Sequence, residues 1–140
     1  MGGSSTLTRR TFLTIAGGAA VSAVCARPAR AARVSLNEKV RLGVIGCGGM
    51  GRAHIYSLAQ NDECTLAALC DVYRPRYEEV VPNVVNITGK APDVYQDFRR
   101  LLDRKDIDAI FVVTPDHWHP LLAIFGCQSG KDVYVEKPVC

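Results

Sequence analysis

The segment from Val40 to Gly51 reads V-R-L-G-V-I-G-C-G-G-M-G and constrains the fold more than any other part of the chain. The apolar run Val40–Ile45 is typical of a buried parallel strand, and a helical pattern begins at Arg52. The three glycines between them permit a tight turn, close approach of a pyrophosphate, and close packing of helix on strand. The free N–H groups of a helix N-terminus favour phosphate oxygens. The pattern therefore predicts a dinucleotide site formed by Gly46, Gly48, Gly49, Met50 and Gly51.

An acidic residue follows at the distance that such a site requires. A second apolar run, Thr65–Cys70, ends in Asp71, twenty-five residues beyond Gly46. A carboxylate in this place accepts hydrogen bonds from the adenosine ribose and repels a 2′-phosphate, so we expect NAD to be preferred. Arg74 lies three residues further on and would partly compensate that repulsion. NADP is therefore the alternative cofactor.

Strand-like and helix-like segments alternate along the chain. The expected helices are 52–60, a segment from Pro75 that weakens by Pro82, 98–104 and 120–129; the expected strands are 40–45, 65–70, 94–95, 109–113 and 132–135, with a loop over 84–92. Alternation on short connections predicts an α/β fold with a Rossmann-type, doubly wound parallel sheet. Ligands of such sheets bind beyond the carboxyl ends of the strands. The loops expected there are 47–51, 71–74, 114–119 and 136–138.

The first 33 residues differ in composition from the rest. They hold five arginines and no acidic residue, whereas residues 34–140 hold 12 basic and 14 acidic residues, so nothing suggests nucleic-acid binding. Arg9-Arg10 precedes a moderately apolar stretch and Ala29-Arg30-Ala31, a layout that resembles a twin-arginine export signal. We expect a signal and linker over 1–33, a periplasmic or extracellular domain over 34–140, and no stable membrane span. A disordered basic tail is the alternative.

Cysteines are expected to serve as small buried hydrophobes. Cys47 lies in the glycine loop, Cys70 in an apolar strand pattern and Cys127 in an apolar helix pattern, and no CxxC pair occurs. Burial explains this usage better than metal ligation or redox chemistry.

Two further motifs follow strands. Thr114-Pro115-Asp116-His117-Trp118-His119-Pro120 allows three interpretations: a metal site, a plain loop in which Asp116 or His119 caps the next helix, or a loop that borders cofactor and substrate. Lys137, in Glu136-Lys137-Pro138, is either a solvated lysine or a residue that fixes a substrate hydroxyl.

With GCGGMG, TPDHWHP and EKP in this order, the chain resembles the glucose–fructose oxidoreductase, inositol dehydrogenase and rhizopine-catabolism (Gfo/Idh/MocA) family from about Val40 onward. The resemblance implies that Thr114, Pro115 and His117 line the nicotinamide side of the cofactor. It also implies that Glu136 and Lys137 face the nicotinamide ribose and the substrate, with Lys137 in a catalytic role.

Members of this family continue into a second α/β domain, which supplies most of the substrate pocket, an acid/base histidine and the oligomer interface. This chain ends at Cys140, three residues past Lys137. We therefore expect a fragment or truncated product that lacks the full active site, with a homo-oligomer only for a full-length form. The full-length protein from which such a fragment would derive is expected to be a nicotinamide-dependent oxidoreductase acting on a sugar, cyclitol or related polyol. The alternatives are an NAD-dependent glycosidase and a non-catalytic dinucleotide-binding module or remnant.

Overall fold

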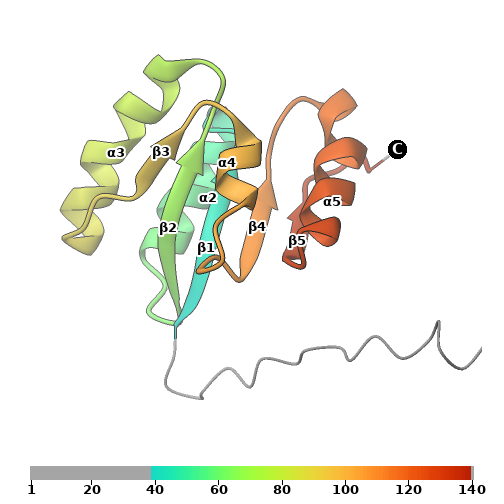
Figure 1. The fold of residues 1–140 in the computed structure, drawn as a ribbon. Coiled ribbons are helices and arrows are strands. Elements are labelled where there is room, and N and C mark those ends of the chain that lie inside the picture. The colour runs from blue at the N-terminus through green and yellow to red at the C-terminus, as the bar shows by residue number, and fades with distance from the viewer. Residues whose placement is uncertain (1–38, 140) are drawn as a thin grey trace, which may run out of the picture. The chain divides into compact units, whose positions relative to one another are not determined.

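The computed structural model describes residues 39–139, and these residues alternate between strands and helices (Figure 1). The predicted signal and linker over 1–33 lie outside the described residues. The elements are β1 (Val40–Ile45), α2 (Gly49–Ala59), β2 (Cys64–Cys70), α3 (Arg74–Thr88), β3 (Asp93–Tyr95), α4 (Phe98–Leu102), β4 (Ala109–Val112), the 3-10 turn η1 (Asp116–Trp118), α5 (His119–Gln128) and β5 (Asp132–Val135).

The five strands form one parallel sheet in the order β3-β2-β1-β4-β5. The chain builds outward from β1 to β3, then crosses back to place β4 on the other side of β1. The order thus reverses beside β1, the place where α/β sheets of this type bind ligands at their carboxyl ends. The predicted Rossmann-type, doubly wound fold is confirmed.

Helices cover both faces of the sheet, because side chains of successive strand residues point to opposite sides. On one face Leu42 and Val44 of β1 pack with residues of α2 and α3. On the other face Ile45 packs with residues of α4 and α5, including Leu101 and Leu122. Two apolar cores therefore hold β1 rigidly in the middle of the sheet.

The helix α3 corrects one prediction, since it runs through Pro82 to Thr88, where we expected a loop from residue 84. Tyr77, Val80 and Val84 are buried on one side of this helix. Pro82 lies on its exposed side, so the carbonyl that the missing N–H leaves unpaired can be hydrated. Burial of the apolar face outweighs the cost of the proline, and Gly89 ends the helix in the left-handed conformation at φ +73°.

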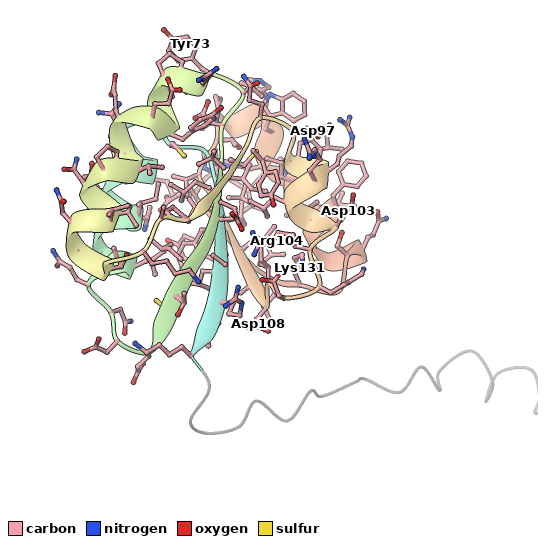
Figure 2. All side chains as sticks on the ribbon, turned by 60° about the vertical axis from the view of Figure 1, so that its left-hand side comes forward. Tyr73, Asp97, Asp103, Arg104, Asp108 and Lys131 are labelled. Atoms are coloured by element: carbon pink, nitrogen blue, oxygen red, sulfur yellow. The ribbon has the colours of Figure 1, made fainter. Side chains whose placement is uncertain are left out.

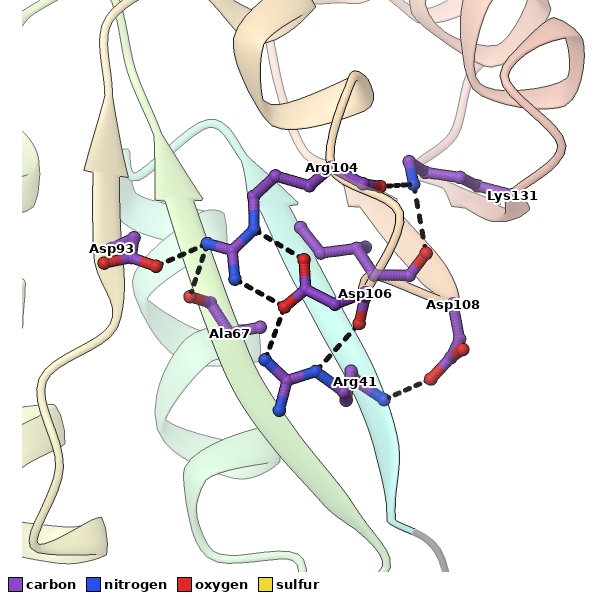
Figure 3. Close-up of polar contacts among 8 residues, drawn as sticks. Arg41, Ala67, Asp93, Arg104, Asp106, Asp108 and Lys131 are labelled. Atoms are coloured by element: carbon purple, nitrogen blue, oxygen red, sulfur yellow. Dashed lines mark hydrogen bonds and ion pairs between the residues drawn. The ribbon is translucent and has the colours of Figure 1, made fainter. Parts of the chain in front are cut away.

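Polar side chains join the strands at their amino ends, the edge of the sheet opposite to the glycine loop. Arg104 donates to Asp93 at 2.5 Å and to Asp106 at 2.7 and 2.9 Å, and Arg41 donates to Asp106 at 2.6 Å (Figure 3). The hydrogen bond from Arg104, followed by that from Arg41, holds the pKa of Asp106 well below its usual range. In Figure 2, Tyr73 and Asp97 lie toward one end of the domain and Asp108 toward the other.

Lys131, just before β5, is buried in this region. Its Nζ donates to the carbonyl oxygens of Arg104 at 2.5 Å and Ile107 at 3.0 Å (Figure 3). The residue is 7% exposed, and burial lowers the pKa of its ammonium group. Lys131 thus links the loop between α4 and β4 to the start of β5 by hydrogen bonds.

Cys127 is exposed on the outer side of α5, contrary to the expected burial, whereas Cys47 and Cys70 are buried as expected.

Within residues 39–139, no helix has the length and apolar character needed to cross a membrane.

Candidate functional site

A cavity of about 520 Å³ opens at the carboxyl ends of β1, β2 and β4. Seven of the predicted site residues line it, namely Gly46, Gly48, Gly49, Met50, Asp71, Thr114 and Pro115. They come from three loops that are far apart in the sequence. The parallel sheet brings them together because all three strands end at the same edge.

The glycine loop has no room for side chains at its two ends. Gly46 has φ +103°, and a Cβ there would overlap the carbonyl of Val113. A Cβ at Gly51 would overlap the carbonyl oxygen of Gly46, so the third glycine lets α2 start directly against the turn. A Cβ at Gly49, in contrast, would meet nothing within 4 Å. The two ends of the motif are therefore required by packing within the protein.

The helix α2 begins at Gly49, three residues earlier than predicted, and its N-terminus has no side-chain cap. No acidic residue lies in its first turn. The first N–H groups of a helix lack intrahelical partners and carry a partial positive charge. Because Gly48 and Gly49 line the cavity, these groups are available to an anion there.

Asp71 joins the glycine loop to the end of β2. One oxygen of its buried carboxylate accepts from the amide of Cys47 at 2.9 Å, and the other accepts from the amide of Tyr73 at 2.9 Å. A carboxylate offers about four acceptor positions, so two hydrogen bonds leave capacity for ligand hydroxyl groups. The side chain is thus fixed in place before any ligand binds.

The two nearby arginines have different positions. Arg74, which we predicted to contact the cofactor, pairs with Glu78 at 2.6 Å and does not line the cavity. Arg76 lines it instead, with Nη1 3.6 Å from the Asp71 carboxylate. Arg76 is not among the residues predicted from the sequence, because both arginines lie in the first turn of α3 and their spacing from Asp71 does not show which one faces the cavity.

The loop after β4 supplies the other side of the cavity. The Thr114 hydroxyl is buried and has no hydrogen-bond partner within residues 39–139. His117, in η1, is exposed, stands beside Trp118 and is not among the lining residues. An unpaired buried hydroxyl next to a cavity is a polar group that a ligand can satisfy.

His119 begins α5 and is almost fully buried, at 1% exposure. Its Nε2 lies 2.7 Å from the carbonyl oxygen of Thr114, and its Nδ1 lies 2.9 Å from that of Pro138. Both partners are carbonyl oxygens, so whichever ring nitrogen carries the N–H donates to one of them. This residue joins the loop after β4 to the segment after β5, a role that the local sequence does not predict.

Glu136 and Lys137 follow β5. The Glu136 carboxylate is directed to His54 of α2, with Oε1 at 2.7 Å from Nε2, and it accepts from the Tyr134 hydroxyl at 3.1 Å. The hydrogen bond from His54 lowers the pKa of Glu136 below its ordinary value, and the one from Tyr134 adds to this. Lys137 is exposed, and neither residue is among those that line the cavity.

The thiols at the site are unreactive by position. Burial raises the pKa of Cys47 to about 12, and burial also raises that of Cys70 to about 12. Thiolates are the reactive form of cysteine, so these two side chains act as packing groups. Across residues 39–139, no three His, Cys, Asp or Glu side chains cluster as metal ligands would.

The site suits a dinucleotide on three structural grounds. An uncapped helix N-terminus meets the cavity where a pyrophosphate would lie, a fixed carboxylate stands at the end of β2, and an unpaired hydroxyl stands at the end of β4. These features lie on both sides of the point where the strand order reverses, which is where dinucleotides bind in this fold.

Comparison with known proteins agrees with this geometry. A family model described as "Oxidoreductase family, NAD-binding Rossmann fold" matches residues 40–140. Among solved structures, myo-inositol dehydrogenase from Lactobacillus casei, in complex with NAD(H) and myo-inositol, has 33% sequence identity and a TM-score of 0.65; the match covers 74% of this chain and 30% of that one.

Curated relatives carry a second type of name. "Glycosyl hydrolase family 109 protein 1" of a Shewanella species is 36% identical over 106 residues, and an alpha-N-acetylgalactosaminidase of Shewanella oneidensis is 35% identical over 106 residues. Each match covers 73% of this chain and 23% of the relative. The chain thus spans about a quarter of the length of these relatives.

Proposed function

The chain belongs to the oxidoreductase family with an NAD-binding Rossmann fold, and from this premise we propose that it is the cofactor-binding part of an enzyme that transfers a hydride between NAD and a carbinol carbon of a sugar, cyclitol or related polyol. The observation that carries this proposal is the cavity that joins the glycine loop, Asp71 and Thr114 at the carboxyl edge of the sheet. Similarity to a dehydrogenase solved with NAD(H) and myo-inositol supports the substrate class.

NAD, when bound, supplies the nicotinamide carbon that accepts or donates the hydride. The N–H groups at the start of α2 bind the pyrophosphate, and Asp71 holds the adenosine ribose. Thr114 and Pro115 border the nicotinamide side. Lys137 would orient the substrate hydroxyl, whose proton would pass to a general base during oxidation; this role needs the lysine within hydrogen-bond reach of that hydroxyl.

Titration of the purified chain with NADH and NADPH tests the cofactor assignment. We expect tighter binding of NADH, because the Asp71 carboxylate accepts from ribose hydroxyls and repels a 2′-phosphate. Arg76 reduces this preference, since its guanidinium lies 3.6 Å from the carboxylate on the cavity wall. Tighter binding of NADPH would contradict the proposed preference, and binding of neither cofactor would contradict the proposed function.

The 140-residue chain by itself is expected to bind NAD without turning over a sugar. Hydride transfer requires a substrate held against the nicotinamide and a proton acceptor in reach, which together supply many orders of magnitude in rate. The solved and curated relatives are three to four times longer than the part they share with this chain. Steady NADH formation from sugars or inositols, abolished by Lys137→Ala, would contradict this expectation.

Glycoside cleavage through transient oxidation by tightly bound NAD is the second candidate, favoured by the names of the curated relatives. The reading frame downstream of Cys140 is the first observation to make. If it encodes a further domain, the longer protein should be assayed with inositols and with an aryl α-N-acetylgalactosaminide. NADH accumulation with inositols supports a dehydrogenase, whereas aryl alcohol release without net NADH supports the glycosidase. A non-catalytic dinucleotide-binding module would give neither NADH accumulation nor release of the aryl alcohol.

We also propose export by the twin-arginine route, supported by Arg9-Arg10 ahead of an apolar stretch. Replacing both arginines with lysine should leave the protein in the cytoplasm on fractionation. Unchanged export would refute this assignment.

A further inference from the structure

The segment Glu136–Pro138 is attached to the rest of the domain at both of its ends by histidines. His54 of α2 contacts the Glu136 carboxylate at 2.7 Å, and His119 of α5 contacts the Pro138 carbonyl oxygen at 2.9 Å. Lys137 lies between these two attachments. The two histidines come from helices on opposite faces of the sheet.

We propose that His54 and His119 are positioning residues that clamp the Glu136–Pro138 segment and thereby hold Lys137 beside the nicotinamide half of the cofactor. This inference rests on the proposed function, because it assigns Lys137 to that half of the site. The contact with His54 gives the Glu136 carboxylate a partner within the protein, on the side of α2.

The attachment at Glu136 is built from several groups. Its Oε1 accepts hydrogen bonds from His54 and from the Tyr134 hydroxyl, and its Oε2 accepts one from the backbone amide of Lys137 at 3.3 Å. The His54 ring also packs beside Phe111, with ring centroids 6.0 Å apart, and beside Tyr134, at 5.7 Å. His54 and Glu136 side chains are only 25% and 15% exposed, so water competes little for this contact.

The attachment at Pro138 links the segment to the cavity itself. The same His119 ring contacts the carbonyl oxygen of Thr114 at 2.7 Å, and Thr114 lines the cavity. Thr114 follows β4, on the opposite side of β1 from Asp71. A dinucleotide that places its adenosine ribose at Asp71 extends across the reversal point toward β4. The clamped segment therefore lies at the nicotinamide end.

Comparison of two ligands separates positioning from general stability. ADP carries the adenosine and pyrophosphate of NADH but lacks the nicotinamide and its ribose. His54→Leu removes the donor to Glu136 while leucine, a good helix former, keeps an apolar contact with the two rings. We expect this variant to bind NADH about fivefold more weakly, the size expected for one hydrogen bond, and to bind ADP as the unmodified chain does.

His54→Gln is the matched rescue variant, since its side-chain amide can donate to Glu136 from the same helical position. We expect NADH affinity within about twofold of the original. In ¹⁵N-resolved spectra, the Lys137 amide should shift in His54→Leu and return in His54→Gln, while the Asp71 amide stays unchanged. The unmodified chain is measured in parallel with both ligands.

If the unmodified chain binds neither ligand, the proposed function fails, and the clamp fails with it. If the unmodified chain binds both, and His54→Leu retains its NADH affinity or loses affinity for both ligands equally, only the clamp is overturned. Should His54→Leu fail to fold, Tyr134→Phe serves as the second variant, because it removes the other side-chain donor to Glu136 Oε1 and keeps the aromatic ring. It must show the same selective loss of NADH binding.

Discussion

Replacing Gly51 with alanine places a methyl group against the carbonyl oxygen of Gly46, which belongs to the backbone and cannot rotate away. Overpacking of this kind costs about 1–3 kcal/mol, and a fixed backbone partner favours the upper end. Alanine recovers about 1 kcal/mol over glycine within a helix. We therefore expect Gly51→Ala to lower the free energy of unfolding by about 2 kcal/mol and to weaken NADH binding by displacing the turn.

Gly49→Ala is the matched control, because a Cβ there meets nothing within 4 Å and the residue lies in the same helix. Its free energy of unfolding should be unchanged or up to about 1 kcal/mol higher. A domain of this size shifts its melting temperature by about 4–8 °C per kcal/mol, so the two variants should separate by at least 8 °C. Urea unfolding of both variants gives the same comparison at constant temperature. Equal stability of the two variants would refute the packing argument for the third glycine.

Three further predictions concern charges and thiols. Arg76→Ala should weaken NADPH binding, whereas Arg74→Ala should not, because Arg76 lines the cavity and Arg74 does not; titration of both variants with NADPH decides this, and equal effects would contradict it. The pKa of Asp106 is lower in the folded state than in the unfolded chain, so its contribution to stability is complete above about pH 4 and is lost as the pH falls through the folded-state pKa; Asp106→Asn should flatten this loss in acid unfolding curves. Maleimide followed by peptide mapping should modify Cys127 well before Cys47 in the folded protein, since Cys127 is exposed and burial raises the pKa of Cys47 to about 12; faster labelling of Cys47 would overturn this order.

The strands were predictable because their apolar residues occur in short runs bounded by turn residues. The bounds of β1 and β5 agree with the prediction at both ends. The helix α3 was not predictable beyond Pro82, since the local signal of a proline opposes helix while the stabilising contacts of Val84 come from distant strands. Tertiary packing decided that element.

The glycine loop, Asp71 and Thr114 were predictable as neighbours because strand ends in a parallel sheet share an edge. Arg76 lines the cavity and Arg74 does not. This difference depends on the directions of the side chains in one helical turn, and the spacing of the two residues from Asp71 does not reveal those directions. The contacts of His54 and His119 join helices to a loop through long sequence separations. No local pattern identifies such pairs.

Lys131 offers a built-in chemical reporter of local opening. Its amine is held against two carbonyl oxygens and shielded from solvent, so acylating reagents reach it only when the start of β5 detaches from the loop before β4. The rate of its modification, compared with that of an exposed lysine outside the cavity such as Lys90, therefore measures how often this corner of the domain opens. The corner lies at the edge of the sheet away from the cavity. Protection of Lys131 by NADH would thus reveal that cofactor binding tightens the whole sheet rather than the binding loops alone.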